Sequence, residues 1–160
     1  MGKGAVAGNG KIQFRVERNR FLVCGPAANP CWKLPLSLPK MHLPDGRWLE
    51  ITVFSKKEAE NQMKINNLLF NNLLDYDTIL NNTFLRTREA GDRFSPAGRG
   101  ISKDLKRLFQ EADIPASKRG QVLLLEQHGI ILWAEGFGAA QQACVTEKTQ
   151  RCALIEIKEC

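Results

Sequence analysis

Basic side chains gather in one stretch of the sequence, residues 86–119. This stretch holds nine lysines and arginines against five acids, an excess of +4 out of a net charge of +6 for all 160 residues. Arg86 and Arg88 alternate, so they share one face of a strand, and Lys103, Lys106 and Arg107 share one helical surface at spacings of three and four. Such a cluster favours a phosphate backbone as partner. A solvated helix beside a loop with internal ion pairs explains it equally well, and composition leaves both interpretations open.

Small and rigid residues interrupt the same stretch before the expected helix. Gly91, Pro96 and Gly98 predict a stiff bend that turns backbone N–H groups towards the start of a helix, where an anion is favoured by geometry and by the helix dipole. Ser102 is the expected N-cap, and Asp104 suits the positive end of the dipole. The loop and the helix are therefore expected to form one cationic surface.

Other chemistries are poorly supported. The segment GFGAAQ at 136–141 has glutamine where a dinucleotide-binding loop needs its third glycine. His42 and His128 stand alone, and turn formation explains Asp75 and Asp77 better than acid–base catalysis does. We therefore predict no catalytic residue, no metal site and no bound cofactor.

The remaining sequence predicts a β-rich domain in a reducing compartment. Five cysteines without a C-x-x-C pair indicate reduced thiols and a cytoplasmic location, and no apolar run of 18 residues predicts a membrane span. Alternating apolar residues and turn signals predict a hairpin at residues 11–24 and a second at 44–55, then a polar seam at 56–67 and one clear helix at 102–110. A strand–turn–strand unit at 122–136 and a strand at 152–159 follow.

The expected fold class is α+β, with a sandwich-like core of short, mostly antiparallel strands and one or two short helices. We divide the chain into a flexible lead-in at residues 1–10, a β-rich N-terminal half at 11–66 and a C-terminal half at 67–160. The two halves are expected to share one core.

The basic stretch closely resembles the signature of the C-terminal domain of bacterial tRNA(Ile)-lysidine synthase. The family pattern runs R-x-R-x-x-G-D-R-x-x-P-x-G, then K-x-L-K-x-x-F, then I-P and an arginine. Its positions are filled here by Arg86, Arg88, Gly91, Asp92, Arg93, Pro96, Gly98, Lys103, Leu105, Lys106, Phe109, Ile114, Pro115 and Arg119. The resemblance covers roughly residues 69–140, with one departure at Leu123, where the family has proline.

This resemblance implies a parent enzyme that uses ATP to attach lysine to the wobble cytidine of an isoleucine tRNA with a CAU anticodon. In that family the chemistry, with its ATP and magnesium, belongs to an N-terminal domain with an S-G-G-x-D-S motif, which this sequence lacks. The chain is therefore expected to be non-catalytic by itself and to hold the tRNA body, particularly the acceptor stem. The implied fold is that of a module of the phenylalanyl-tRNA synthetase β-subunit.

Resemblance and charge together give a set of expected RNA contacts: Arg86, Arg88, Arg93, Lys103, Lys106, Arg107 and Arg119. The loop is expected to be shaped by Gly91, Asp92, Pro96 and Gly98, with Asp92 orienting an arginine. An alternative is a docking domain that packs on the parent's catalytic domain without touching RNA. The sequence leaves open whether the chain forms a homodimer.

Overall fold

The computed structural model describes residues 13–17, 20–24, 31–66 and 72–159. The expected lead-in at residues 1–10 lies outside the described residues. The elements, in chain order, are β1 (Gln13–Glu17), β2 (Arg20–Cys24), β3 (Lys33–Pro35), β4 (Lys40–His42), β5 (Trp48–Ser55), α1 (Lys56–Ile65), β6 (Leu73–Asp75), the 3₁₀-helix η2 (Tyr76–Thr78), β7 (Thr83–Thr87), β8 (Arg93–Phe94), β9 (Lys103–Asp104), α2 (Leu105–Glu111), α3 (Ala116–Arg119), β10 (Leu123–Gln127), β11 (Ile130–Ala134), β12 (Gly138–Ala139) and β13 (Arg151–Lys158). None of the helices in the described part of the chain has the length and apolarity to cross a bilayer.

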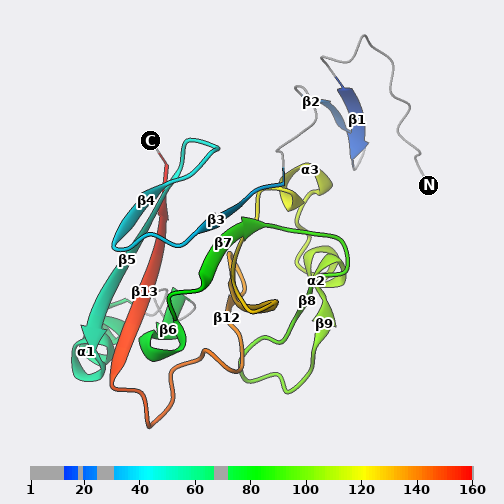
Figure 1. Cartoon of the computed structure of the whole chain (residues 1–160). Helices are drawn as coiled ribbons and strands as arrows, with labels where there is room; N and C mark the ends of the chain where they lie inside the picture. Colours follow the sequence, from blue (N-terminus) through cyan, green and yellow to red (C-terminus); the bar gives the residue numbers. More distant parts are fainter. Residues whose placement is uncertain (1–12, 18–19, 25–30, 67–71, 160) are drawn as a thin grey trace.

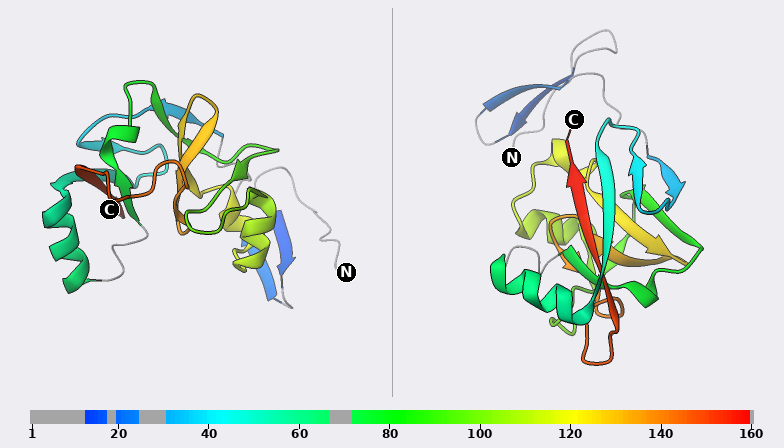
Figure 2. Two further views of the ribbon diagram at one scale, coloured as in Figure 1. Left: turned by 90° about the horizontal axis from the view of Figure 1, so that it is seen from below. Right: turned by 90° about the vertical axis from the view of Figure 1, so that its left-hand side faces the viewer.

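Two antiparallel sheets enclose the main core (Figures 1 and 2). One has five strands in the order β12-β11-β10-β7-β3, and the other has four in the order β4-β5-β13-β6. Leu49 and Ile155 of the smaller sheet meet Leu85, Leu125 and Trp133 of the larger one in a single buried cluster. The expected β-rich fold with a sandwich-like core is confirmed, and strands from residues 33–55 and from 73–158 build the same core.

The larger sheet buries its other face under the basic stretch. Successive strand residues point to opposite faces, so Leu124 faces away from the main core. Leu124 and Ile131 pack with Phe94, Leu108 and Phe109 in a second buried cluster. The apolar side of α2 is therefore fixed to the sheet, and its charged side faces outward.

Helix α1 covers the far face of the smaller sheet, where we expected a polar seam. Its Ala59 packs with Cys152 and Leu154 of β13. The N-terminus is closed by a capping box: Ser55 Oγ accepts from the Glu58 backbone N–H at 3.3 Å, and the Ser55 N–H donates to Glu58 Oε2 at 2.9 Å. The polar stretch is thus a capped helix with Met63 also packed against this cluster, and its role as a seam between two halves stays a prediction.

The predicted hairpins are present. Strands β1 and β2 pair with each other, and β4 pairs with β5. The β10–β11 turn has φ of 51° at His128 and 78° at Gly129, as a tight two-residue turn requires.

The predicted helix at 102–110 starts later than expected. Lys103 and Asp104 form β9, paired with Arg93 and Phe94 of β8, and the helix begins at Leu105. Ser102 is therefore not the N-cap. Asp104 takes that role, because its side chain accepts from the Lys106 backbone N–H at 2.8 Å.

Candidate functional site

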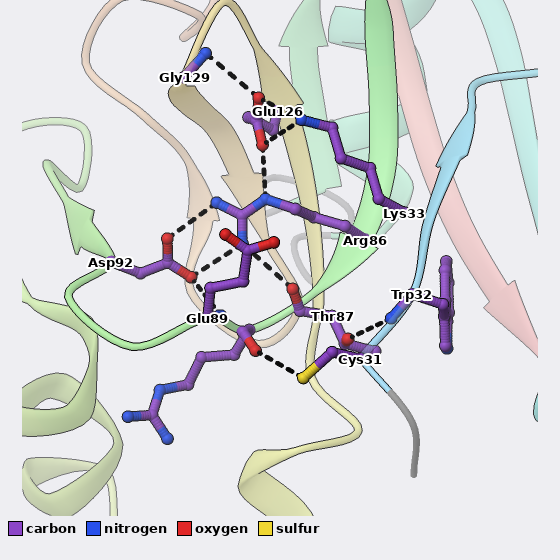
Figure 3. A network of polar contacts seen from close by, with 10 residues as sticks. Cys31, Trp32, Lys33, Arg86, Thr87, Glu89, Asp92, Glu126 and Gly129 are labelled. Carbon is purple, nitrogen blue, oxygen red and sulfur yellow. Dashed lines mark hydrogen bonds and ion pairs between the residues drawn. The ribbon is translucent and has the colours of Figure 1, made fainter.

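Arg86 lies at the centre of a buried ion network (Figure 3). Its side chain is only 4% exposed. Its Nε donates to Glu126 Oε2 at 2.6 Å, while Nη1 and Nη2 donate to the two carboxylate oxygens of Asp92, both at 2.8 Å. Lys33 donates to Glu126 from the other side at 3.0 Å, and Glu126 also accepts from the Gly129 N–H. The network ties β3, β7 and β10 to the loop that follows β7.

The carboxylates of this network stay ionised because cations and N–H groups surround them. Burial raises the pKa of Asp92, but the hydrogen bonds from Arg86 and from the Glu89 N–H outweigh it, and the pKa lies below its usual value. Burial likewise raises the pKa of Glu126, but the hydrogen bonds from Lys33 and Arg86 outweigh this effect. The pKa of Glu126 therefore also lies below its usual value. Burial lowers the pKa of Arg86, but Asp92 and Glu126 raise it above its usual value.

These pKa shifts predict loss of stability in acid. A carboxylate with a lowered folded-state pKa stabilises the fold fully above its unfolded pKa, near 4, and loses that contribution as pH falls through the folded-state pKa. In urea unfolding at pH 7, 5, 4 and 3, Asp92→Asn should therefore be less stable than the wild type at pH 7, with the gap closing below about pH 4. A gap independent of pH would contradict the assignment.

Arg86 is a structural group in this arrangement. Its side chain donates four hydrogen bonds to protein oxygens. The fourth runs from Nη1 to the Thr87 carbonyl at 3.1 Å. The expectation that Arg86 contacts RNA is corrected by its burial: no donor is left on the surface. Asp92 orients this arginine.

The loop between β8 and β9 is held at fixed points. Pro96 is buried and forms a β-bridge with Ala140, and the Gly98 N–H donates to Gln141 Oε1 at 2.9 Å. Gly91 and Gly98 have φ of 85° and 74°, a backbone conformation that favours glycine. Pro96 and Gly98 thus shape a bend attached to Ala140 and Gln141, just after β12, while Gly91 lies in the turn before β8.

The outward side of α2 carries the exposed charge. Lys106 is exposed, and no ion pair or side-chain hydrogen bond involves its ammonium among the described residues. The Arg107 side chain is 74% exposed, and its Nε lies 3.3 Å from Glu111 Oε1. Lys103 projects from β9 rather than from the helix, and its Nζ holds both oxygens of Glu111, at 2.8 and 3.1 Å. The three cations form one surface, with Glu111 neutralising part of it.

The first two N–H groups of α2 are bonded to protein oxygens. Asp104 accepts from the Lys106 N–H, and the Leu105 N–H donates to the Asp92 carbonyl at 2.8 Å. The expected phosphate site at the helix start is therefore corrected: a carboxylate already occupies it.

The remaining expected contacts are partly engaged. Arg93 is exposed and donates through Nη2 to the Ser102 carbonyl at 3.0 Å. Arg119 is half-buried and donates through Nε to a backbone carbonyl of the preceding turn at 2.8 Å. Arg88 is half-buried, with its guanidinium carbon 5.9 Å from the centre of the Phe109 ring.

Three residues of this region were missed from the sequence. Glu126 is the second carboxylate on Arg86, and its signal was a single acid inside the apolar run VLLLEQ. Arg99 and Lys118 are exposed cations within the basic stretch that were counted there but not chosen as contacts. The discounted acids have structural partners: Asp75 accepts from Thr149, and Asp77 pairs with Arg151.

Comparisons with known proteins agree on one family. The family model described as "TilS substrate C-terminal domain" matches residues 83–156. The tRNA(Ile)-lysidine synthase of Caldanaerobacter subterraneus subsp. tengcongensis is 34% identical over 82 residues, which are 51% of this chain and 18% of that protein. The enzyme of the same name from Dehalococcoides mccartyi is 35% identical over 85 residues, 53% of this chain and 18% of that protein.

A solved structure matches more of the chain than these relatives do. It is described as "Crystal structure of TILS C-terminal domain", and it aligns with a TM-score of 0.62 and 25% identity over 81% of this chain and 98% of that one. The structural likeness therefore extends beyond residues 83–156. The chain spans 18% of the length of the curated relatives named above.

Proposed function

Because this chain carries the C-terminal domain of the tRNA(Ile)-lysidine synthase family, we propose that it binds the body of an isoleucine tRNA with a CAU anticodon. Its part in the reaction is to hold the acceptor stem while another part of the enzyme ligates lysine to the wobble cytidine. We assign the use of ATP and magnesium to that other part, and the chain described here is non-catalytic by itself.

The observation that carries this proposal is the exposed cationic side of α2. Lys106 and Arg107 stand on a helix whose opposite side, with Leu108 and Phe109, is fixed in the second core cluster. Charges on a rigid base lose little conformational freedom when they meet a phosphate backbone. Two more exposed cations come from the same part of the sequence: Arg93 in β8 and Arg99 in the loop between β8 and β9.

An RNA stem suits such a surface. Its wide, shallow minor groove displays 2′-hydroxyls and phosphates, so shape and charge supply most of the affinity. Each phosphate neutralised by a lysine or arginine releases counterions and adds about 0.7–0.9 to the slope of log affinity against log salt. Binding by this chain should therefore weaken steeply as salt rises.

Charge reversal on α2 tests the proposal. The double variant Lys106→Glu/Arg107→Glu should bind isoleucine tRNA at least about tenfold more weakly than the wild type, with a shallower salt slope. The helix should tolerate both changes, because acids are favoured in the first turn. Loss of the exposed Arg107–Glu111 pair and the new repulsion of residue 107 with Asp104 and Glu111 oppose them, at about 0.2–0.5 kcal/mol for each pair. Fluorescence anisotropy with labelled tRNA measures the affinity.

A matched variant controls for net charge. Lys57 of α1 and Lys148 are exposed, and neither ammonium has an ion pair or hydrogen bond among the residues that the structure describes. Reversing both changes the net charge by the same amount on the side of the molecule covered by α1, and it should leave tRNA affinity within about twofold of wild type. Equal weakening by the two double variants would refute specific binding at α2. No weakening by either would favour a domain that only packs on its catalytic partner.

A further inference from the structure

We propose that Arg88 binds one phosphate group of the RNA through two parallel hydrogen bonds from its planar guanidinium, a fork of two N–H donors. Its contribution then depends on this geometry and not on its positive charge alone. The inference rests on the proposed RNA-binding function and adds the chemistry of one contact to it. Arg86 and Arg88 both belong to the basic stretch, but the protein bonds the guanidinium of the first and leaves that of the second without hydrogen bonds among the described residues.

The protein leaves the donors of Arg88 unused. Its Nε is buried and has no hydrogen-bond partner among the described residues, and no hydrogen bond from its other guanidinium nitrogens occurs there either. An outside anion cannot reach the buried Nε, but Nη1 and Nη2 are not among the buried unpartnered atoms, so these two nitrogens are open to a ligand. A half-buried guanidinium in this state gains strongly from an anion that can accept from two of its nitrogens at once.

The nearby carboxylate of Asp92 is bonded to Arg86 and to a backbone N–H rather than to Arg88. Asp92 lies close enough for the charge of Arg88 to contribute to the lowering of its pKa, behind the larger effects of burial, of Arg86 and of the Glu89 N–H. Both oxygens of Asp92 are already engaged: Oδ1 accepts from Arg86, and Oδ2 accepts from Arg86 and from the Glu89 N–H. Arg86 thus takes two of the three hydrogen bonds that Asp92 accepts, and Arg88 takes none of them.

The backbone at Arg88 is held by its neighbours, and one ring contacts its guanidinium. The Arg88 carbonyl accepts from Cys31 Sγ at 3.8 Å, and the Thr87 N–H donates to the Trp32 carbonyl at 3.1 Å. The Trp32 N–H donates back to Thr87 Oγ1 at 3.2 Å (Figure 3). The guanidinium lies over the Phe109 ring, a cation–π contact that restricts its orientation. A fixed, unpaired, planar fork fits a phosphate, whose oxygens accept two parallel N–H bonds.

Replacement by lysine separates geometry from charge. Arg88→Lys keeps the charge but loses the fork, so it should weaken tRNA binding about tenfold with an unchanged salt slope. Arg88→Met, which still covers the Phe109 ring, should weaken binding at least as much and lower the slope by about 0.7–0.9. Arg151→Lys, the same substitution at an exposed arginine of β13 outside the proposed surface, should bind within about twofold of wild type. Thermal unfolding of each variant shows whether it is folded at the temperature of the binding assay.

Inorganic phosphate distinguishes the source of the phosphate group. At constant ionic strength it should raise the melting temperature of the wild type but not of Arg88→Lys, and it should displace tRNA only at concentrations far above those at which tRNA saturates the protein. Wild-type affinity in Arg88→Lys would overturn the inference, while weak binding by the α2 double variant would still uphold the proposed function. If the wild type binds no tRNA, the proposed function fails. In that case, a rise in melting temperature with phosphate that is seen in the wild type but not in Arg88→Lys would still support an anion site at Arg88. The same rise in both proteins would refute that site.

Discussion

Replacing Arg86 with methionine is expected to lower the free energy of unfolding by about 3–5 kcal/mol. The change removes a buried cation and leaves the carboxylates of Asp92 and Glu126 close together without their shared partner, at 11% and 8% side-chain exposure. Removing one partner of a buried ion network is strongly destabilising, because the remaining charges stay desolvated and lose their partner. Replacing all the partners together costs much less. Urea unfolding at pH 7 measures the loss.

Neutralising the two acids as well should recover much of that stability. In Arg86→Met/Asp92→Asn/Glu126→Gln the amide oxygens can still accept from the backbone N–H groups of Glu89 and Gly129, and no unpaired buried charge remains. Arg86→Lys should fall between the single and triple variants, since one ammonium cannot replace donors aimed at two separate carboxylates. A loss below about 1 kcal/mol for Arg86→Met would show that the network contributes little.

Replacing Phe109 with alanine is expected to cost about 3–5 kcal/mol and to weaken tRNA binding at the same time. The ring is fully buried, stacks on Phe137 with centroids 5.6 Å apart, and lies under the Arg88 guanidinium. The cavity loosens the attachment of α2 to the larger sheet, so the cations on its outward side lose their fixed positions. Urea unfolding and anisotropy with labelled tRNA, at a temperature where the variant is folded, measure the two effects.

Phe109→Leu is the matched control, because it fills most of the same volume. It should cost less than Phe109→Ala and keep tRNA binding near the wild-type level. Full tRNA affinity in folded Phe109→Ala would show that the cations do not depend on the position of α2.

Local patterns in the sequence were sufficient for the hairpins and for the strand β13. Turn residues such as His128-Gly129 need a particular backbone conformation, and alternation such as that of Ile155 and Ile157 against Glu156 is visible over a few residues. The β-rich fold follows from such local signals.

The burial of Arg86 could not be predicted in this way. Its partner Glu126 is 40 residues away, and only the pairing of β7 with β10 brings the two side chains together. The cap at Asp104 depends in the same way on β9 pairing with β8, which ends the extended backbone one residue before the helix. The wrong predictions for the basic stretch, RNA contact by Arg86 and capping by Ser102, concern residues whose positions are fixed by strand pairing.

The place of β13 in its sheet has a consequence for how the protein is made. This strand lies between β5 and β6, pairing with Trp48–Ser55 on one side and Leu73–Asp75 on the other. During synthesis both flanking strands leave the ribosome well before residues 151–158 exist, and until then each has an edge open to intermolecular pairing. Completion of the smaller sheet is therefore a late, long-range step, and until β13 emerges the open edges of β5 and β6 favour aggregation of the nascent chain.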